Sequence, residues 1–165
     1  MTRVVRLDEL PGLVGQELGV SRWHELTQAT VDQFAAATGD HQWIHVDPRR
    51  AAAESPWGAP VAHGLLTLGL LPSMITDAVT VDGVDVIVNK GFDKVRLANP
   101  VLVGARVRGA VRLASARQRP RGFHEVGLTV TVEVDGQPGT ALKAETIFLY
   151  HQAAVLAPGC EGAHA

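Results

Sequence analysis

The longest apolar run of this 165-residue chain is Leu65-Leu66-Thr67-Leu68-Gly69-Leu70-Leu71-Pro72-Ser73-Met74-Ile75. As a helix it is apolar on every side, so the rest of the protein must surround it. Pro72 has no amide hydrogen and predicts a kink or a looser last turn. The run is shorter than the ~20 residues that a bilayer span needs, so we expect no membrane segment.

Downstream of this stretch, alternation of apolar and polar residues predicts strands. Val84 to Val88 is the first. In Arg106 to Leu113 the apolar residues alternate with arginine, and in Glu125 to Val134 they alternate with glutamate and threonine. Period-two alternation is typical of half-buried strands. Asp135-Gly136 predicts a turn into a last strand, Ala141 to Tyr150. One buried helix followed by long antiparallel strands indicates an α+β fold, with the sheet wrapped around a long central apolar helix.

Two helices are predicted upstream of the apolar stretch. Thr27 or Thr30 can cap the first helix, and Gly39 suits its C-terminal end. Asp47-Pro48 predicts the start of a shorter helix, Arg49 to Glu54, because Asp is a good N-cap and Pro fits the first helical position.

The composition is that of a globular protein, with 46% hydrophobic and 19% charged residues. A formal charge of −2 gives no strong field to recruit nucleic acid or an anionic membrane. Cys160 is the one cysteine, which excludes an intrachain disulfide and fits a reducing, cytoplasmic compartment. Met1 to Glu9 lacks the apolar core of a signal peptide. We expect one domain over residues 1–152 and a flexible tail over residues 153–165.

The stretch that carries chemistry lies between the two upstream helices: Thr38-Gly39-Asp40-His41-Gln42-Trp43-Ile44-His45-Val46-Asp47. Asp40 and His45 place a carboxylate and an imidazole five residues apart on a turn, where they can hold and activate one water. Ala62-His63-Gly64 comes directly before the apolar helix. A glycine that opens a helix can offer a bare backbone N–H to a developing oxyanion.

These residues also have structural interpretations. An Asp after a helix often only stabilises a turn, Gly64 can merely permit a tight turn, and His63 favours a structural hydrogen bond over catalysis. His41 and His45 have the i, i+4 spacing of a metal pair. A zinc site needs three ligands on a fixed frame, however, and Gly39 interrupts the helix before them. We therefore expect no metal and no redox cofactor.

The same residues match a known pattern. Phe34-Ala35-x-x-Thr38-Gly39-Asp40-x-x-x-x-His45 and Gly58-x-x-Val61-Ala62-His63-Gly64 resemble the MaoC-like, (R)-specific enoyl-CoA hydratase family. The resemblance continues in Asn89-Lys90-Gly91-Phe92-Asp93-Lys94-Val95-Arg96 and Pro100-Val101-x-Val103-Gly104, a pattern similar to the nodulation-protein-N-like subgroup. It covers the chain from about Leu26 to Tyr150.

The resemblance implies a hot-dog fold, usually dimeric, that acts on acyl thioesters of coenzyme A. It implies that Asp40 and His45 share the base and acid roles. Water then adds to C3 of a trans-2-enoyl-CoA, a proton reaches C2, and the product is an (R)-3-hydroxyacyl-CoA. A backbone N–H near Gly64 would hold the thioester oxyanion. No cofactor is implied, because coenzyme A is part of the substrate.

One departure from the family pattern concerns the pocket. Gln42 and Trp43 stand where the family motif commonly has Asn and Pro. Gln42 keeps the hydrogen-bonding groups of an amide, and Trp43 and Trp57 are candidate pocket walls because they lie in predicted loops. Basic residues on the strands favour a solvated sheet face, with contact to the phosphates of coenzyme A as the alternative; they are Lys94, Arg96, Arg106, Arg108 and Arg112.

A homodimer is expected on physical grounds as well. A sheet wrapped around one helix leaves two edges, and an unpaired edge on a long strand such as Glu125 to Val134 invites pairing with a second copy. Two other functions stay open. A hot-dog acyl-CoA thioesterase would use Asp40 or another carboxylate to direct water at the carbonyl and would liberate a free thiol. A non-catalytic acyl-thioester-binding subunit is disfavoured because both Asp40 and His45 are present.

Overall fold

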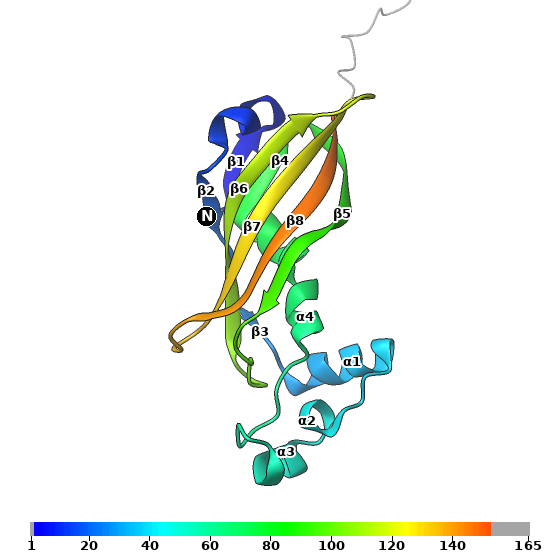
Figure 1. Ribbon diagram of the computed structural model, residues 1–165, viewed down its shortest axis with the longest axis vertical. Coiled ribbons are helices and arrows are strands. Elements are labelled where there is room, and N and C mark those ends of the chain that lie inside the picture. Colours follow the sequence, from blue (N-terminus) through cyan, green and yellow to red (C-terminus); the bar gives the residue numbers. More distant parts are fainter. Residues whose placement is uncertain (1, 153–165) are drawn as a thin grey trace, which may run out of the picture.

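A computed structural model describes residues 2–152, and the expected tail over residues 153–165, with Cys160, lies outside the described residues. An antiparallel sheet wraps around a pair of short helices, and three further helices lie at one end (Figure 1). The elements are β1 (Arg3–Arg6), the 3-10 helix η1 (Leu7–Leu13), β2 (Glu17–Val20), β3 (His24–Glu25), α1 (Gln28–Thr38), α2 (Trp43–Val46), α3 (Pro48–Glu54), α4 (Gly64–Gly69), α5 (Leu71–Ala78), β4 (Val79–Asp82), β5 (Val84–Leu97), β6 (Arg106–Gln118), β7 (Phe123–Val134) and β8 (Thr140–Gln152). The predicted α+β class is confirmed.

The apolar stretch forms two helices, α4 and α5, so the expectation of one long central helix is wrong. Leu70 separates them, and Pro72 lies in the first turn of α5. Proline there has no N–H to continue the hydrogen bonds of α4, whereas a first helical turn needs none. Leu65 is 63% exposed, so this single chain does not surround the stretch on every side. The opposite side is buried under the sheet through Leu66, Leu71, Met74 and Ile75.

The long sheet has the strand order β2-β6-β7-β8-β5, with β3 also paired to β6. β7 is paired with β6 on one side and with β8 on the other. The expectation that Glu125 to Val134 offers an edge is therefore wrong. The Asp135-Gly136 turn folds β8 back beside β7, and β8 then pairs with β5, which leaves β5 as the edge strand.

The edge strand β5 is unusually apolar for its exposure. Among the described residues its only strand partner is β8, and its pairing is interrupted at three register shifts. Six of its apolar side chains are each at least 38% exposed: Val86, Ile87, Val88, Phe92, Val95 and Leu97. A long, apolar, unpaired edge is a surface on which another strand can add.

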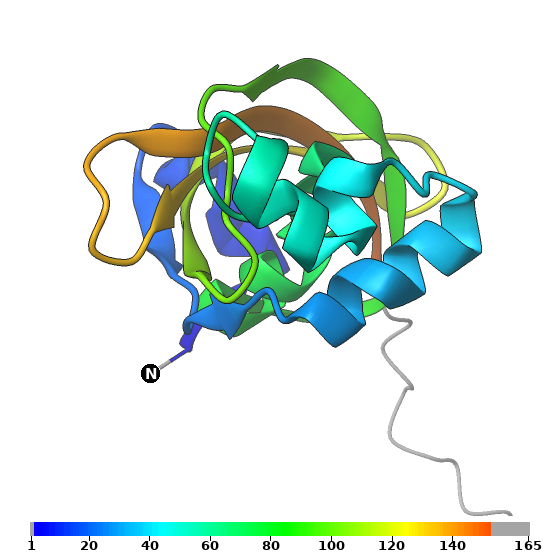
Figure 2. The same cartoon turned by 90° about the horizontal axis from the view of Figure 1, so that it is seen from below.

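The two predicted upstream helices begin and end close to the expected residues, whereas α2 was not predicted and places Trp43 in a helix instead of a loop. The Thr27 side chain accepts a hydrogen bond from the Thr30 N–H, and Gly39 ends α1 with a left-handed φ of 78°. Asp47 caps α3 through the Arg50 N–H at 3.0 Å. Figure 2 shows α1, α2 and α3 gathered across one end of the sheet, next to α4. Within residues 2–152, no helix is long and apolar enough to cross a membrane.

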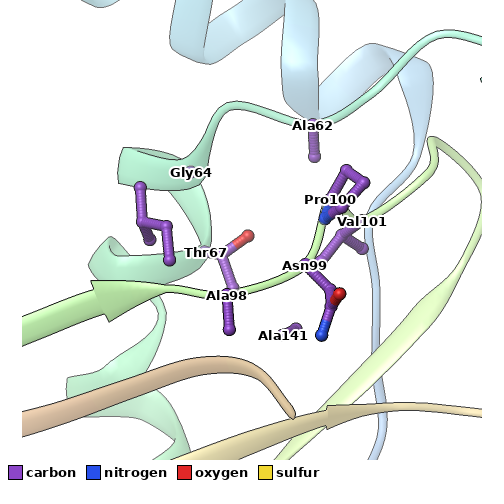
Figure 3. Close-up of a pocket in the computed structure, with 9 residues that line it drawn as sticks. Ala62, Gly64, Thr67, Ala98, Asn99, Pro100, Val101 and Ala141 are labelled. Atoms are coloured by element: carbon purple, nitrogen blue, oxygen red, sulfur yellow. The ribbon is translucent and has the colours of Figure 1, made fainter. Parts of the chain in front are cut away.

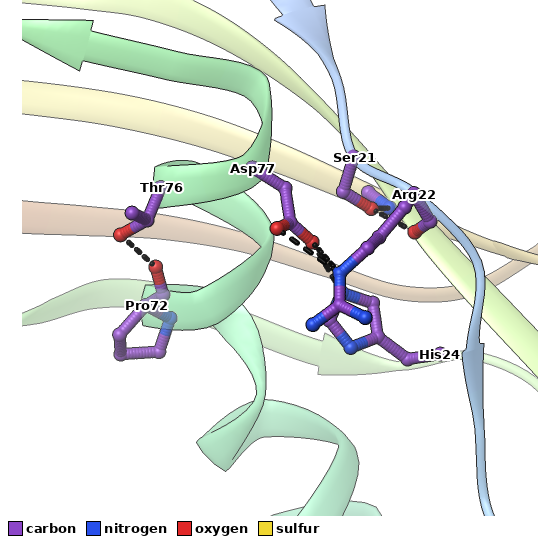
Figure 4. A network of polar contacts seen from close by, with 7 residues as sticks. Ser21, Arg22, His24, Pro72, Thr76 and Asp77 are labelled. Carbon is purple, nitrogen blue, oxygen red and sulfur yellow. Dashed lines mark hydrogen bonds and ion pairs between the residues drawn. The ribbon is translucent and has the colours of Figure 1, made fainter. Parts of the chain in front are cut away.

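A polar network fixes α5 to the N-terminal strands (Figure 4). The Asp77 carboxylate lies 2.8 Å from His24 Nε2 and accepts from Arg22 Nε at 3.2 Å. Ser21 Oγ accepts from the Gly109 N–H of β6 at 3.0 Å. The side of α5 that faces away from the apolar core is thereby held to the segment between β2 and β3, which sets the position of the helix pair.

A second set of charges ties the edge strand to the sheet and makes stability depend on pH. Glu125 accepts hydrogen bonds from Lys90 at 2.5 Å and Arg119 at 2.7 Å, and these bonds lower the pKa of its carboxyl to about 2. A carboxyl whose pKa is depressed in the folded state stabilises the fold above its unfolded pKa, and this contribution is lost as the pH falls through the folded pKa.

We expect Glu125→Gln to lower the melting temperature by roughly 2–5 °C at pH 7. Below about pH 4.5 the difference in melting temperature between the variant and the wild type becomes steadily smaller. Protonation of the wild-type Glu125 carboxylate removes the stability that its depressed pKa provides at higher pH. Thermal melts at pH 7, 4 and 3 measure this. The control is Glu54→Gln, which removes an exposed ion pair with Arg50 (2.9 Å) and should have little effect. A difference in melting temperature between Glu125→Gln and the wild type that stays constant from pH 7 to pH 3 would contradict the expectation.

Candidate functional site

Three polar side chains from separate elements converge beside the start of α4. Asp40 follows the left-handed Gly39 at the end of α1, His45 lies in α2, and His63 is the last residue before α4. One carboxylate oxygen of Asp40 and one ring nitrogen of each histidine all lie within 4.8 Å of one another. Both imidazoles are buried, whereas the Asp40 side chain is 55% exposed. The predicted pairing of Asp40 with His45 is thus present in space.

The hydrogen bond of His45 fixes its tautomer. Its Nδ1 lies 2.6 Å from the backbone carbonyl oxygen of Val61. A carbonyl can only accept, so Nδ1 carries the hydrogen and Nε2 of the neutral ring keeps a free lone pair. The Gln28 side chain holds the backbone from the other side, donating to the His45 carbonyl at 2.8 Å. His45 is therefore held as a proton acceptor through Nε2.

His63 positions the other two members of the cluster. Its Nε2–H donates to the Asp40 backbone carbonyl at 3.0 Å, and its ring stacks on His45 with centroids 3.8 Å apart. Phe34 of α1 packs on the same ring at 4.9 Å. A structural hydrogen bond was the favoured interpretation of His63. The bond exists, but it reaches 23 residues back along the chain instead of closing its own turn.

The spacing of the cluster suits a water better than a metal ion. Two hydrogen bonds of about 2.8 Å that meet at one water span about 4.6 Å. Zinc bonds of about 2.1 Å would draw the ligand atoms to about 3.4 Å of each other, whereas His63 Nε2 lies 4.0 Å from the Asp40 carboxylate and is already bonded to the Asp40 backbone. His41 is exposed and outside this cluster.

A cavity of about 240 Å³ opens at the start of α4 (Figure 3). Gly64 and Thr67 of α4 line one side, and the end of β5 with the loop after it lines the other. Gly64 is the first residue of α4, so its N–H has no acceptor within the helix. A Cβ at position 64 would overlap Leu97 Cδ1, so a larger residue here would displace the Leu97 side chain at the end of the edge strand.

The remaining predicted site residues lie further out. Gln42 precedes α2 and is exposed, with its backbone N–H 3.4 Å from the Asp40 carboxylate. The Trp43 ring lies under the Arg50 guanidinium at 4.4 Å, and Trp57 is exposed in the loop after α3. Neither tryptophan lines the cavity at Gly64.

The strand arginines behave mostly as a solvated sheet face. Arg108 pairs with Glu133 at 2.5 Å and stacks on Trp23 at 4.4 Å. Arg106 pairs with Asp135, and Lys94 pairs with Glu145 at 3.2 Å; Arg96 and Arg112 are exposed. The charges of Lys94, Arg106 and Arg108 are matched by carboxylates, and all five residues fit the favoured interpretation of a solvated sheet face.

Sequence reasoning missed two features of the candidate site. The Val61 carbonyl sets the tautomer of His45, and a backbone oxygen has no signature in a sequence. Thr67 places a hydroxyl in the wall of the cavity. The signal that could have found Thr67 is a polar residue at position i+3 from Gly64 in an otherwise apolar run, since i and i+3 share a helix face.

The chain is similar to known proteins over most of its length. Residues 9–136 match the MaoC like domain family. The chain is 45% identical over 142 residues to 3-hydroxyacyl-thioester dehydratase Z of Mycobacterium tuberculosis, covering 86% of this chain and 93% of the relative. It is 44% identical over 144 residues to Nodulation protein N of Rhizobium meliloti, covering 87% and 89%.

Solved structures show the same fold. R-Hydratase PhaJ1 from Pseudomonas aeruginosa is similar with a TM-score of 0.68 at 21% identity, covering 90% of this chain and 92% of that chain. The (R)-hydratase from A. caviae is similar with a TM-score of 0.65 at 24% identity, covering 82% and 94%. These similarities confirm the hot-dog fold. The chain therefore belongs to the MaoC-like dehydratase family and is a hydro-lyase.

Proposed function

We propose that this protein reversibly hydrates trans-2-enoyl-CoA to (R)-3-hydroxyacyl-CoA. One observation carries the proposal: the Asp40 carboxylate and the His45 imidazole lie within 4.8 Å, with the His45 tautomer set by Val61. A thioester substrate is supported by the relative that is named 3-hydroxyacyl-thioester dehydratase Z.

In this proposal Asp40 and His45 hold one water between them. The pair removes a proton from the water as its oxygen adds to C3 of the enoyl thioester, and negative charge moves to the thioester carbonyl oxygen. The Gly64 N–H, which has no acceptor within α4, donates to that oxygen. A proton from the pair then reaches C2, and the reverse sequence eliminates water. His63 acts as a positioning residue, because it holds the Asp40 backbone and the His45 ring.

Substitution of the pair tests the assignment. Asp40→Asn and His45→Ala should each lower turnover of a short-chain enoyl-CoA by about 10²–10⁴-fold, since each removes proton transfer. Turnover is followed as loss of the enoyl-thioester absorbance, and a thermal melt checks that each variant is folded. His41→Ala is the matched control, because His41 is an exposed neighbour outside the cluster.

Three outcomes would overturn the assignment. Turnover of either variant within a few-fold of the wild type would remove Asp40 and His45 from the chemistry. Release of free thiol from an acyl-CoA, without hydration of the enoyl-CoA, would indicate the thioesterase reaction instead. Binding of the thioester without either reaction would indicate a non-catalytic subunit.

We also propose that the reaction needs no metal and no redox cofactor. The 4.0 Å separation of His63 from the Asp40 carboxylate and the hydrogen bond that already occupies His63 Nε2 support this. After incubation with a strong chelator and desalting, activity should stay within about twofold of the untreated protein, because proton transfer by the pair needs no Lewis acid. Loss of activity that only added zinc or iron restores would contradict the expectation.

The protein is further proposed to be a homodimer joined through β5. This strand is the edge that carries the exposed apolar side chains, and its last residue, Leu97, also lines the cavity at Gly64. A two-fold partner would continue the sheet, cover these side chains and bring its own chain close to the candidate site. The acyl-thioester substrate would then be enclosed near the seam between the two copies.

Light scattering behind size exclusion at micromolar concentration should give twice the mass of the 17.5 kDa chain. Val88→Lys, which places a charge on the apolar edge, should shift the protein toward the single-chain mass. Val4→Lys is the matched control, because Val4 is an exposed valine on the short strand β1. A wild-type protein of single-chain mass with full activity would show that the seam is not needed.

A further inference from the structure

The Thr67 side chain is buried, yet its hydroxyl has no partner. Thr67 is 2% exposed, and no group among residues 2–152 forms a hydrogen bond with its Oγ1. A helical threonine commonly satisfies its hydroxyl on a carbonyl three or four residues earlier. Here the His63 carbonyl instead accepts from the Leu66 N–H at 3.1 Å and the Thr67 N–H at 3.2 Å. A buried hydroxyl without a partner is unfavourable unless something else bonds to it.

The unpartnered hydroxyl points into the cavity at Gly64. Figure 3 shows the Thr67 oxygen directed toward Asn99 and Pro100, across the cavity from α4. The Asn99 amide nitrogen is already bonded to the Thr140 carbonyl at 2.7 Å. Helical side chains lean toward the N-terminus of their helix, so this hydroxyl lies over the turn that begins at Gly64.

The chemistry of the cavity limits what the hydroxyl can bind. Small apolar groups from Ala62, Ala98 and Ala141 form much of the wall, which disfavours a charged group such as a phosphate. The cavity is therefore suited to an apolar ligand that carries one uncharged acceptor. The carbonyl of an acyl thioester, flanked by sulfur on one side and carbon on the other, has this character.

We propose that the Thr67 hydroxyl donates a hydrogen bond to the carbonyl oxygen of the bound acyl thioester, beside the N–H of Gly64. This inference rests on the proposed hydratase function. The bond strengthens as negative charge builds on the oxygen, so Thr67 stabilises the transition state more than the bound substrate. Removal of the hydroxyl should therefore lower kcat more than it raises KM.

Thr67→Val keeps the shape of the side chain and removes the hydroxyl. We expect kcat for enoyl-CoA hydration to fall by about 10–10²-fold with KM changed by less than about threefold. Thr67→Ser restores the hydroxyl and should stay within about threefold of the wild type. The melting temperature of Thr67→Val should equal or exceed that of the wild type, because the substitution removes an unpartnered buried hydroxyl.

Thr146→Val is the matched control. Thr146 is 1% exposed, and its hydroxyl donates to the Gly91 carbonyl at 3.3 Å, away from the cavity. This variant should lose melting temperature and keep kcat, the reverse of Thr67→Val. A kcat of Thr67→Val within twofold of the wild type would overturn the inference, as would a loss of melting temperature like that of Thr146→Val.

A binding measurement separates this inference from the hydratase proposal. Butyryl-CoA carries the thioester carbonyl, whereas the thioether S-butyl-CoA lacks it. The wild type should bind butyryl-CoA more tightly than the thioether, and in Thr67→Val this preference should become smaller without disappearing, because the Gly64 N–H still donates to the carbonyl. If wild-type protein failed to hydrate enoyl-CoA but showed this pattern, the hydratase proposal would fail and the role of Thr67 would stand. An unchanged preference in Thr67→Val would overturn the role of Thr67 whatever the activity.

Discussion

The concave face of the sheet packs so closely on α5 that it fixes the position of this helix. A Cβ on Gly109 of β6 would lie 3.0 Å from Met74 Sδ, and a Cβ on Gly19 of β2 would lie 2.7 Å from the Ala78 carbonyl. Larger residues at these positions would push the helix off the sheet. Asp77 of α5 also bonds to Arg22 and to His24 of β3, and Ser21 beside them bonds to Gly109 of β6, so apolar packing and polar contacts fix one position of the helix.

Because α5 is fixed, α4 is fixed as well. The segment that leads into α4 contributes to both parts of the candidate site, the Asp40–His45 pair and the cavity at Gly64. Val61 bridges to Leu102, and its carbonyl sets the tautomer of His45. The Ala62 N–H donates to the Val101 carbonyl at 2.8 Å, which holds the loop that closes the cavity. His63 turns to Asp40, whereas Gly64 and Ala62 line the cavity. The four residues Val61 to Gly64 therefore connect the Asp40–His45 pair to the cavity. These connections involve no side chain from the interior of the sheet.

The parts that the sequence predicted well are those with local causes. The caps at Thr27, Gly39 and Asp47 depend on neighbours within a few residues, and strand alternation depends on which face is buried. The order of the strands depends on contacts between residues that are far apart in the sequence. The edge was therefore predicted at Glu125 to Val134, whereas the structure places β5 at an edge of the sheet. The approach of His63 to Asp40 over 23 residues was likewise invisible, although the family motif placed both near the chemistry.

The two fold expectations that this chain does not meet have a common physical origin. Leu65 is exposed although the apolar stretch favours burial on every side, and β5 is an exposed edge although its sequence is apolar. The two surfaces adjoin, because Leu97 at the end of β5 contacts Gly64, the residue before Leu65. The chain therefore has more apolar side chains than its own core buries, and the exposed ones are concentrated beside the cavity. An exposed apolar surface of this kind is typical of an interaction site, and the proposed second copy would bury the side chains that one copy leaves exposed.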